Sequence, residues 1–289
     1  MRRTIDELIA LYDLEPTTRR DIYVEGTDDR DLFGWYLEQI KQTSRGVFCV
    51  NDVDVPAQRI EELGLNRGSN RDRVIALAVL IWQSIDRNHC KLSFVVDADL
   101  SKCFHKHCVP VGVLTTDFPA TDCYLLNDEL VDRFLYVHCR VPKDRAPQMR
   151  ASLFDVCVFL YALRVVLASF PIFVRIVGVE RLLRVNSGRL ELDKGAVVRR
   201  TLSTCGRLAD FELVEFAVEE VLKTIQSTGL SALHFSHGHD ALQILGEAVH
   251  LQIADSGYRN ESRVRRSLLM SLRPDMLNGF ELFKRLEAA

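Results

Sequence analysis

The stretch "RRDIYVEGTDDRDLFGWYLEQI", residues 19–40, decides the fold class that we predict for this 289-residue chain. Ile22–Val24 is an apolar run typical of a buried β-strand, and Gly26 close behind it indicates an abrupt turn. Apolar residues then recur at helical spacing over residues 32–40. Glu25 lies between the strand and the turn. A charged residue is unusual at the end of a strand that is buried among helices. We therefore interpret Glu25 as a site residue.

The first 140 residues alternate between strand and helix patterns. Further strands are predicted in "GVFCVN" (46–51), "KLSFVVDADL" (91–100) and "PVGVLTTD" (110–117), and a long helix in "SNRDRVIALAVLIWQSI" (69–85). This order predicts an α/β fold with an open, mainly parallel sheet flanked by helices. In such sheets, functional groups gather at the carboxyl ends of the strands.

The remainder of the chain has a different pattern. Residues 138–149 carry two prolines and mixed charge, which is typical of a linker, and mostly helical patterns follow. We predict an α/β domain over 1–140, which carries Glu25, and a mostly helical domain over 141–289 for substrate grip, dimerisation or partner docking. The most apolar stretch, 153–179, has Arg164 near its middle, which costs about 2.5–3.5 kcal/mol in a bilayer. A buried core helix is therefore expected there, and no membrane contact.

Composition narrows the classes of function. The net charge is −3, so a nucleic-acid partner would have to be held by local basic patches. The eight cysteines include no CxxC pair and the first residues are charged rather than apolar, which favours a protein with reduced thiols in the cytoplasm. "CFHKHC" at 103–108 invites a zinc interpretation, but its crowded ligands lack the usual paired spacing, and a polar loop is the favoured alternative.

Three carboxylates follow predicted strands in a way that points to metal chemistry. Glu25 follows the first strand, and Asp97 and Asp99 follow the third. Carboxylates gathered at one edge of a sheet repel each other, and a divalent cation relieves that repulsion. All-oxygen ligands favour Mg²⁺ or Mn²⁺, which assist phosphodiester cleavage. Asp52 and Asp54 form a rival pair after the second strand, but the extended segment before Pro56 favours loop acids there.

Several motifs together resemble a known family. "YVEGTDDRDLF" followed by "FVVDADL" resembles the Toprim signature of an acid and glycine after the first strand and DxD after the third. "RGSNRDRVI", "VLTTDFPATDCYLL" and "FSHGHDALQIL" extend the similarity over most of the chain to the compact Toprim nucleases of bacterial anti-phage defence, the effectors of PARIS systems. The resemblance implies a Toprim-like sheet and a metal-dependent phosphodiesterase.

The same resemblance implies a biological role. It implies an endoribonuclease toxin that cleaves host tRNA and is restrained by an ABC/OLD-type partner ATPase (AriA-like). A homodimer is expected after release. The chain contains no GxxxxGK[ST] phosphate-binding loop, so nucleotide-driven control would have to come from another protein. Two alternatives stay open: a nuclease that nicks DNA, and a non-catalytic docking module.

Site residues are assigned partly from the resemblance. It makes Glu25, Asp97 and Asp99 the catalytic metal ligands. After the fourth strand, where relatives often have Glu, either Asp117 or Asp122 could supply a further ligand. Asp29, at the start of the helix after Gly26, could contact a second ion. Helix capping explains Asp29 equally well. Possible accessory groups for phosphate binding or proton transfer are His237, His239 and Asp240. Arginine-rich segments are the candidates for nucleic-acid binding, with solvated surface as the alternative. These residues are Lys194, Arg199, Arg200, Arg207, Arg263, Arg265 and Arg266.

Overall fold

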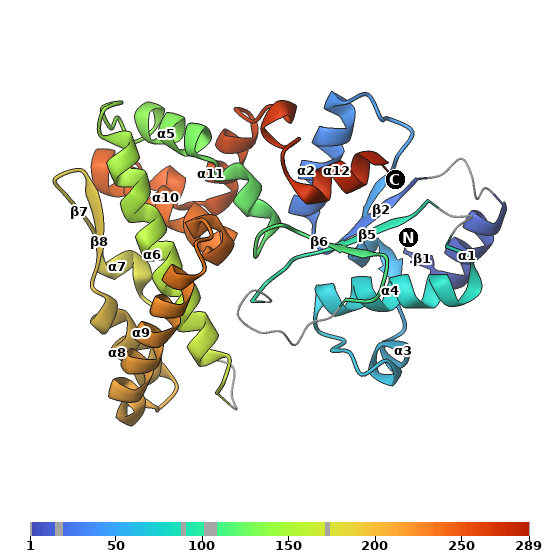
Figure 1. The fold of residues 1–289 in the computed structure, drawn as a ribbon, viewed down its shortest axis with the longest axis horizontal. Helices are drawn as coiled ribbons and strands as arrows, with labels where there is room; N and C mark the ends of the chain where they lie inside the picture. The colour runs from blue at the N-terminus through green and yellow to red at the C-terminus, as the bar shows by residue number, and fades with distance from the viewer. Residues whose placement is uncertain (1, 15–19, 88–90, 101–108, 171–173, 289) are drawn as a thin grey trace. The chain divides into compact units, whose positions relative to one another are not determined.

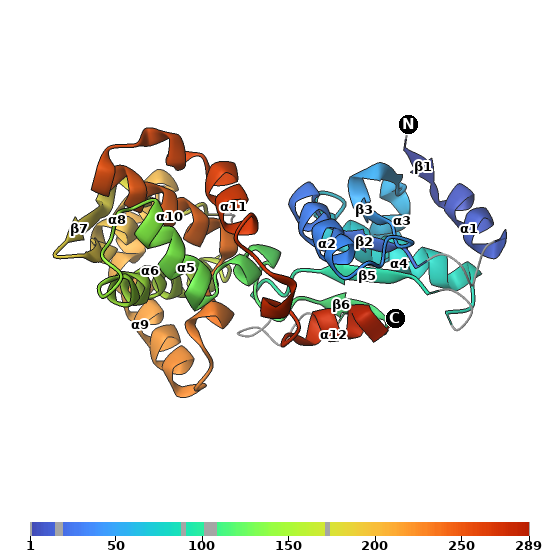
Figure 2. The ribbon, with the colours of Figure 1, turned by 90° about the horizontal axis from the view of Figure 1, so that it is seen from above.

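The computed structural model describes residues 2–14, 20–87, 91–100, 109–170 and 174–288 (Figures 1 and 2). The chain forms two compact units. Unit 1 comprises the described parts of Met1–Ala98, His105–Asp117 and Arg273–Ala289, and unit 2 those of Asp99–Phe104 and Phe118–Leu272. The division falls between residues 117 and 118 rather than at 140, and the last 17 residues return to unit 1. The segment 103–108, considered above for zinc, lies outside the described residues.

Unit 1 is built on a four-stranded parallel sheet. Its strands, in spatial order, are β3 (Val47–Cys49), β2 (Ile22–Val24), β5 (Ser93–Val96) and β6 (Val113–Thr115). This confirms the predicted α/β class with a mainly parallel sheet flanked by helices. The strand order reverses between β2 and β5, because the chain leaves β2 toward β3 and afterwards continues on the other side. Ligands of open α/β sheets bind at such a reversal, beyond the carboxyl ends of the strands.

Helices cover both faces of this sheet, as Figure 1 shows, with α2 (Thr27–Gln39) and α12 (Glu281–Ala288) on one side and α4 (Asn70–Ser84) on the other. The rings of Tyr36 and Phe283 lie 4.7 Å apart and fix α12 on α2. The face of α4 packs with α1 (Ile5–Leu14) in a core that includes Tyr23 and Phe94 of the strands. Smaller elements complete the unit: β1 (Arg3–Thr4), β4 (Val53–Asp54), α3 (Ala57–Glu62) and the 3₁₀-helices η1 (Val50–Asp52) and η6 (Pro274–Met276).

Unit 2 is mostly helical, as predicted for the second half of the chain. Its long elements are α5 (Asp128–Val137), α6 (Ala146–Leu167), α8 (Lys194–Thr204), α9 (Phe211–Ser227), α10 (Gly238–Ile253) and α11 (Glu261–Leu269). Short α7 (Val179–Leu182) leads into an antiparallel hairpin of β7 (Leu183–Asn186) and β8 (Arg189–Leu192). The 3₁₀-helices are η2 (Thr121–Leu125), η3 (Leu208–Asp210), η4 (Ala232–Phe235) and η5 (Ser256–Arg259).

Helix α6 is the centre of unit 2. It packs against α5, α9, α10 and the hairpin, and most of its side chains are buried. This is where the sequence predicts a buried helix from the apolar run around Arg164. Within the part of the chain that the structure describes, no helix combines the length and the apolar character that crossing a membrane requires.

Candidate functional site

Glu25 lies at the carboxyl end of β2, between the strand and α2. The three residues of β2 are buried, and Gly26 adopts an extended backbone as the N-cap of α2. The carboxylate of Asp29 accepts a hydrogen bond of 2.9 Å from the Gly26 N–H. Asp29 therefore caps the helix, which is the alternative role that the sequence left open for it.

The structure brings Glu25 and Asp97 together. Glu25 Oε1 accepts a hydrogen bond of 2.7 Å from the backbone N–H of Asp97, which follows the neighbouring strand β5. Arg71 of α4 donates to the Asp97 carbonyl oxygen at 3.2 Å, and the Ala98 N–H donates to Thr116 Oγ1 at 2.8 Å. These bonds fix the loop after β5 on three sides, so the position of Asp97 beside Glu25 is well defined.

Asp99 follows in a left-handed backbone conformation. Its φ of 48° is one that aspartate tolerates better than most residues, and such conformations are enriched at functional sites. The Asp99 N–H donates to the Pro119 carbonyl oxygen at 3.0 Å within unit 2, and the contacts of Asp99 place it with that unit. The chain therefore turns sharply two residues after Asp97.

The rival acids after β3 have local roles. Asp52 Oδ2 accepts a hydrogen bond of 3.1 Å from the Cys49 N–H, which closes the turn of η1. Asp54 lies in the exposed part of β4. Asp117, another acid near the end of a strand, accepts hydrogen bonds from the N–H groups of Glu281 and Leu282 and thereby caps α12. The capping bonds of Asp52 and Asp117 are common structural uses of carboxylates.

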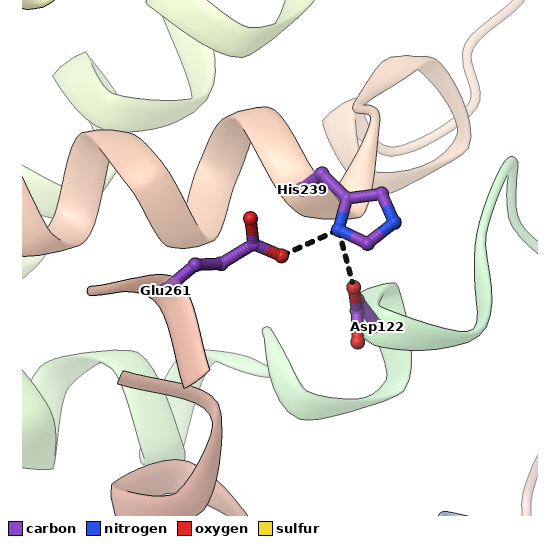
Figure 3. A group of neighbouring side chains, drawn as sticks. All are labelled: Asp122, His239 and Glu261. Atoms are coloured by element: carbon purple, nitrogen blue, oxygen red, sulfur yellow. Dashed lines mark hydrogen bonds and ion pairs between the residues drawn. The ribbon is translucent and has the colours of Figure 1, made fainter. Parts of the chain in front are cut away.

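A second group of potential ligands lies within unit 2 (Figure 3). Asp122 of η2, His239 in the first turn of α10 and Glu261 in the first turn of α11 each offer one ligand atom, and these atoms lie within 4.8 Å of one another. His239 Nδ1 bonds Glu261 Oε1 and lies 3.4 Å from Asp122 Oδ2. We call these three residues the Asp122 cluster. Its nitrogen and carboxylate ligand atoms could hold a metal ion.

Arg265 already supplies a positive charge to the Asp122 cluster. Its Nη2 lies 2.5 Å from Asp122 Oδ2 and 3.7 Å from Glu261 Oε1, and the residue is only 8% exposed. Burial lowers the pKa of Arg265 to about 10, so it stays protonated at neutral pH. Arg265, one of the predicted nucleic-acid-binding arginines, is thus buried and ion-paired inside unit 2.

The cluster depends on a close approach that the sequence marks with a glycine. A Cβ atom at Gly238 would lie 2.4 Å from the Cβ of Asp122 and 3.3 Å from its Cα. Only glycine lets the start of α10 come so near η2. In "HGHD" the glycine therefore permits packing, and the flanking polar groups have separate tasks.

Two of those groups are structural. Arg164 of α6 binds Asp240 through two hydrogen bonds, of 3.0 and 2.6 Å, which fixes α10 on α6. His237 is the N-cap residue of α10, and its Nδ1 is buried with no hydrogen-bond partner among the described residues. Burial lowers the pKa of His237 to about 4, against the opposing effect of the Asp240 charge. His237 is therefore neutral at pH 7.

We expect His237 to make unit 2 acid-sensitive. The unfolded chain takes up this proton near pH 6.5, whereas the folded chain resists it until about pH 4. The free energy of unfolding is therefore unaffected by this titration above pH 6.5. It decreases as the pH falls from 6.5 toward 4, by up to about 3 kcal/mol in total. Urea unfolding of His237→Asn and the wild type at pH 7.5 and 5 should show a smaller loss for the variant, because asparagine keeps an N-cap but does not titrate. Equal losses would contradict this assignment.

The other predicted nucleic-acid-binding residues lie on the surface or along aromatic rings. Lys194 Nζ lies 5.4 Å from the centre of the Phe159 ring, and the Arg199 guanidinium lies 4.5 Å from that of Phe211. Arg207 pairs with Asp210. Arg200, Arg263 and Arg266 are exposed, and Arg263 lies over the Tyr258 ring. Except for Arg207, which is half-buried, these charges remain accessible to solvent.

Comparisons with known proteins add no assignment to this geometry. No protein-family model matches the sequence, and no curated protein matches it.

Proposed function

We propose that this chain is a metal-dependent endonuclease of the Toprim type, with Glu25, Asp97 and Asp99 as the residues that hold Mg²⁺ or Mn²⁺. The observation that carries the proposal is the contact between Glu25 and the backbone of Asp97 at the reversal of strand order. Ligand sites of open parallel sheets lie at that place. The acids on both sides of it offer the oxygen atoms that these cations prefer.

The residues fit phosphodiester chemistry. A bound Mg²⁺ would stabilise the negative charge that develops on the phosphoryl oxygens during cleavage. Glu25 is anchored by the Asp97 N–H through one oxygen, so its carboxylate is held in a fixed orientation. We assign to Glu25 the removal of a proton from the attacking nucleophile, and to Asp97 and Asp99 the positioning of the cation. The dipole of α2, whose N-cap is Gly26, favours negative charge in the same region.

The proposed substrate and partner follow from the resemblance described above. The chain would act as a tRNA-cleaving toxin of the AriB type in a PARIS defence system. An AriA-like ATPase would restrain it until infection, and it would act as a homodimer after release. The absence of a phosphate-binding loop from the sequence supports control by a separate ATPase.

Removal of the metal should stop cleavage. We expect purified protein to cut deacylated tRNA in Mg²⁺ or Mn²⁺, to leave it intact in EDTA and to regain activity when Mg²⁺ is restored, because the acids alone cannot stabilise the developing charge. Electrophoresis of tRNA, supercoiled plasmid and single-stranded DNA incubated side by side checks this. Nicked plasmid beside intact tRNA would favour the DNA nuclease. If all three substrates stay intact and calorimetry detects no Mg²⁺ binding, the result would favour the non-catalytic docking module.

A further inference from the structure

The segment from residue 175 to 207 of unit 2 is strongly basic in a chain whose net charge is −3. Its acidic residues are Glu180, Glu191 and Asp193. Its basic residues are Arg175, Arg181, Arg184, Arg189, Lys194, Arg199, Arg200 and Arg207. Such local asymmetry of charge indicates contact with a polyanion rather than a uniformly solvated surface.

The structure shows that most of these charges are available. Seven of the eight side chains are exposed, and no carboxylate of the described residues forms an ion pair with any of the seven. Only Arg207 is partly buried and is paired, to Asp210. We call the seven exposed residues the basic surface. They are Arg175, Arg181, Arg184, Arg189, Lys194, Arg199 and Arg200.

The elements that carry the basic surface are joined to each other. The Asp193 N–H at the end of the hairpin donates to the Leu182 carbonyl oxygen of α7. Arg200 of α8 lies across Gly178 at the start of α7, because a Cβ at Gly178 would be 2.5 Å from Arg200 Cδ. The charges of α7, the hairpin and α8 therefore belong to one continuous region of unit 2.

The hairpin gives the basic surface a rigid, outward-facing edge. Ser187 and Gly188 have φ of 50° and 77°, the tight turn that suits a two-residue hairpin. Leu183 and Leu190 are buried, and the Leu190 N–H donates to Ser152 Oγ of α6, so one side of the ribbon is anchored. Since side chains alternate along a strand, Arg184 and Arg189 face outward on the opposite side. Asn186 pairs with Arg189 in the register and adds a polar group there.

We propose that the basic surface binds the phosphate backbone of a nucleic acid. Arginine, which supplies six of its seven charges, forms paired hydrogen bonds with phosphate. A membrane would require apolar side chains that insert beside the charges, and none of the large exposed apolar residues lies on α7, the hairpin or α8. This inference deepens the proposed nuclease function, because it assigns the grip on the substrate to unit 2.

The test measures binding without cleavage. In EDTA, fluorescence anisotropy should report binding of labelled tRNA and of a labelled DNA duplex to the wild type. We expect Arg184→Ala/Arg189→Ala to bind at least about tenfold more weakly at 100 mM salt, and the slope of log K against log salt to fall by about 2. A second variant, Arg199→Ala/Arg200→Ala, tests the helix separately. Tighter binding of tRNA than of the duplex, or the reverse, shows whether the basic surface binds RNA or DNA.

The matched control is Arg133→Ala, an exposed arginine of the same unit that pairs with Glu129. It should bind within about twofold of the wild type, since an ion-paired arginine has less charge to offer. Wild-type affinity in both double variants would overturn the proposal, as would an equal loss in the control. Binding to phosphatidylserine vesicles is measured for the same proteins. If the double variants bind tRNA as the wild type does but no longer bind the vesicles, the basic surface would be a membrane-binding surface. If the wild type binds nucleic acid through the basic surface but does not cleave it in Mg²⁺, the proposed nuclease function is wrong and the proposed role of the basic surface is still supported.

Discussion

Glu25→Gln should reduce the Mg²⁺-dependent cleavage rate by about three orders of magnitude while unit 1 stays folded. Loss of a metal-ligating carboxylate that also accepts the nucleophile's proton typically costs on the order of 10²–10⁴ in rate. Glutamine keeps the shape of the side chain, and its amide oxygen can still accept the hydrogen bond from the Asp97 N–H. The fold around β2 and β5 is therefore preserved when the charge is removed.

Single-turnover cleavage of labelled tRNA measures the effect, and thermal melting by circular dichroism checks the fold. The matched control is Asp54→Asn, which removes an exposed acid from the rival DxD segment after β3 and should leave the rate within about twofold. A Glu25→Gln protein that cleaves at the wild-type rate would disprove the assigned role of Glu25. Loss of activity in Asp54→Asn instead would move the site to the end of β3.

The edge of the sheet could be predicted because its signals are local. An apolar run that ends in an acid predicts both a strand and a charge at its tip, and this pattern occurs before Glu25 and before Asp97. The rules of parallel sheets then place the carboxyl ends of both strands at the same edge of the sheet, where functional groups gather. The order of the strands was not predicted: β2 lies next to β5, with Ile22 opposite Ser93, and this brings Glu25 to the N–H of Asp97.

The contacts of the Asp122 cluster could not be predicted in the same way. Asp122 and Arg265 are separated by 143 residues, and no local pattern indicates which distant side chain a carboxylate meets. A weaker signal was present in α11, where Val264 and Leu268 mark the buried stripe and Arg265 lies next to it at helical spacing. A run of arginines on a helix does not by itself show which of them points inward.

The return of the chain to unit 1 has a similar explanation. Leu282, Phe283 and Leu286 give α12 one apolar side, which predicts an amphipathic helix. That side packs on α2, where the Phe283 ring contacts the rings of Phe33 and Tyr36. The sequence does not indicate that α2, rather than another helix, is the partner of α12. Amphipathicity predicts that the apolar side of a helix packs against another element. Which element this is depends on how all the side chains of the core fit together.

Asp122→Ala should destabilise unit 2 by about 3–5 kcal/mol, the usual cost of leaving one partner of a buried ion pair uncompensated. Arg265 is 8% exposed, and Glu261 Oε1, which lies 3.7 Å from it, is too far away for a hydrogen bond of ordinary length. Urea unfolding followed by circular dichroism measures the loss. Asp122→Leu/Arg265→Met, which removes both charges, should recover most of it because no buried charge is left unpaired.

The control is Glu129→Ala, which breaks an exposed pair with Arg133 one turn away on α5 and should cost no more than about 0.5 kcal/mol. Each protein is unfolded with and without EDTA, because a metal ion held by Asp122, His239 and Glu261 would make the wild type less stable on chelation and leave Asp122→Ala unaffected. If Asp122→Ala unfolds at the wild-type urea concentration, the pair contributes no stability. The close packing at Gly238 would then be what holds α10 to η2.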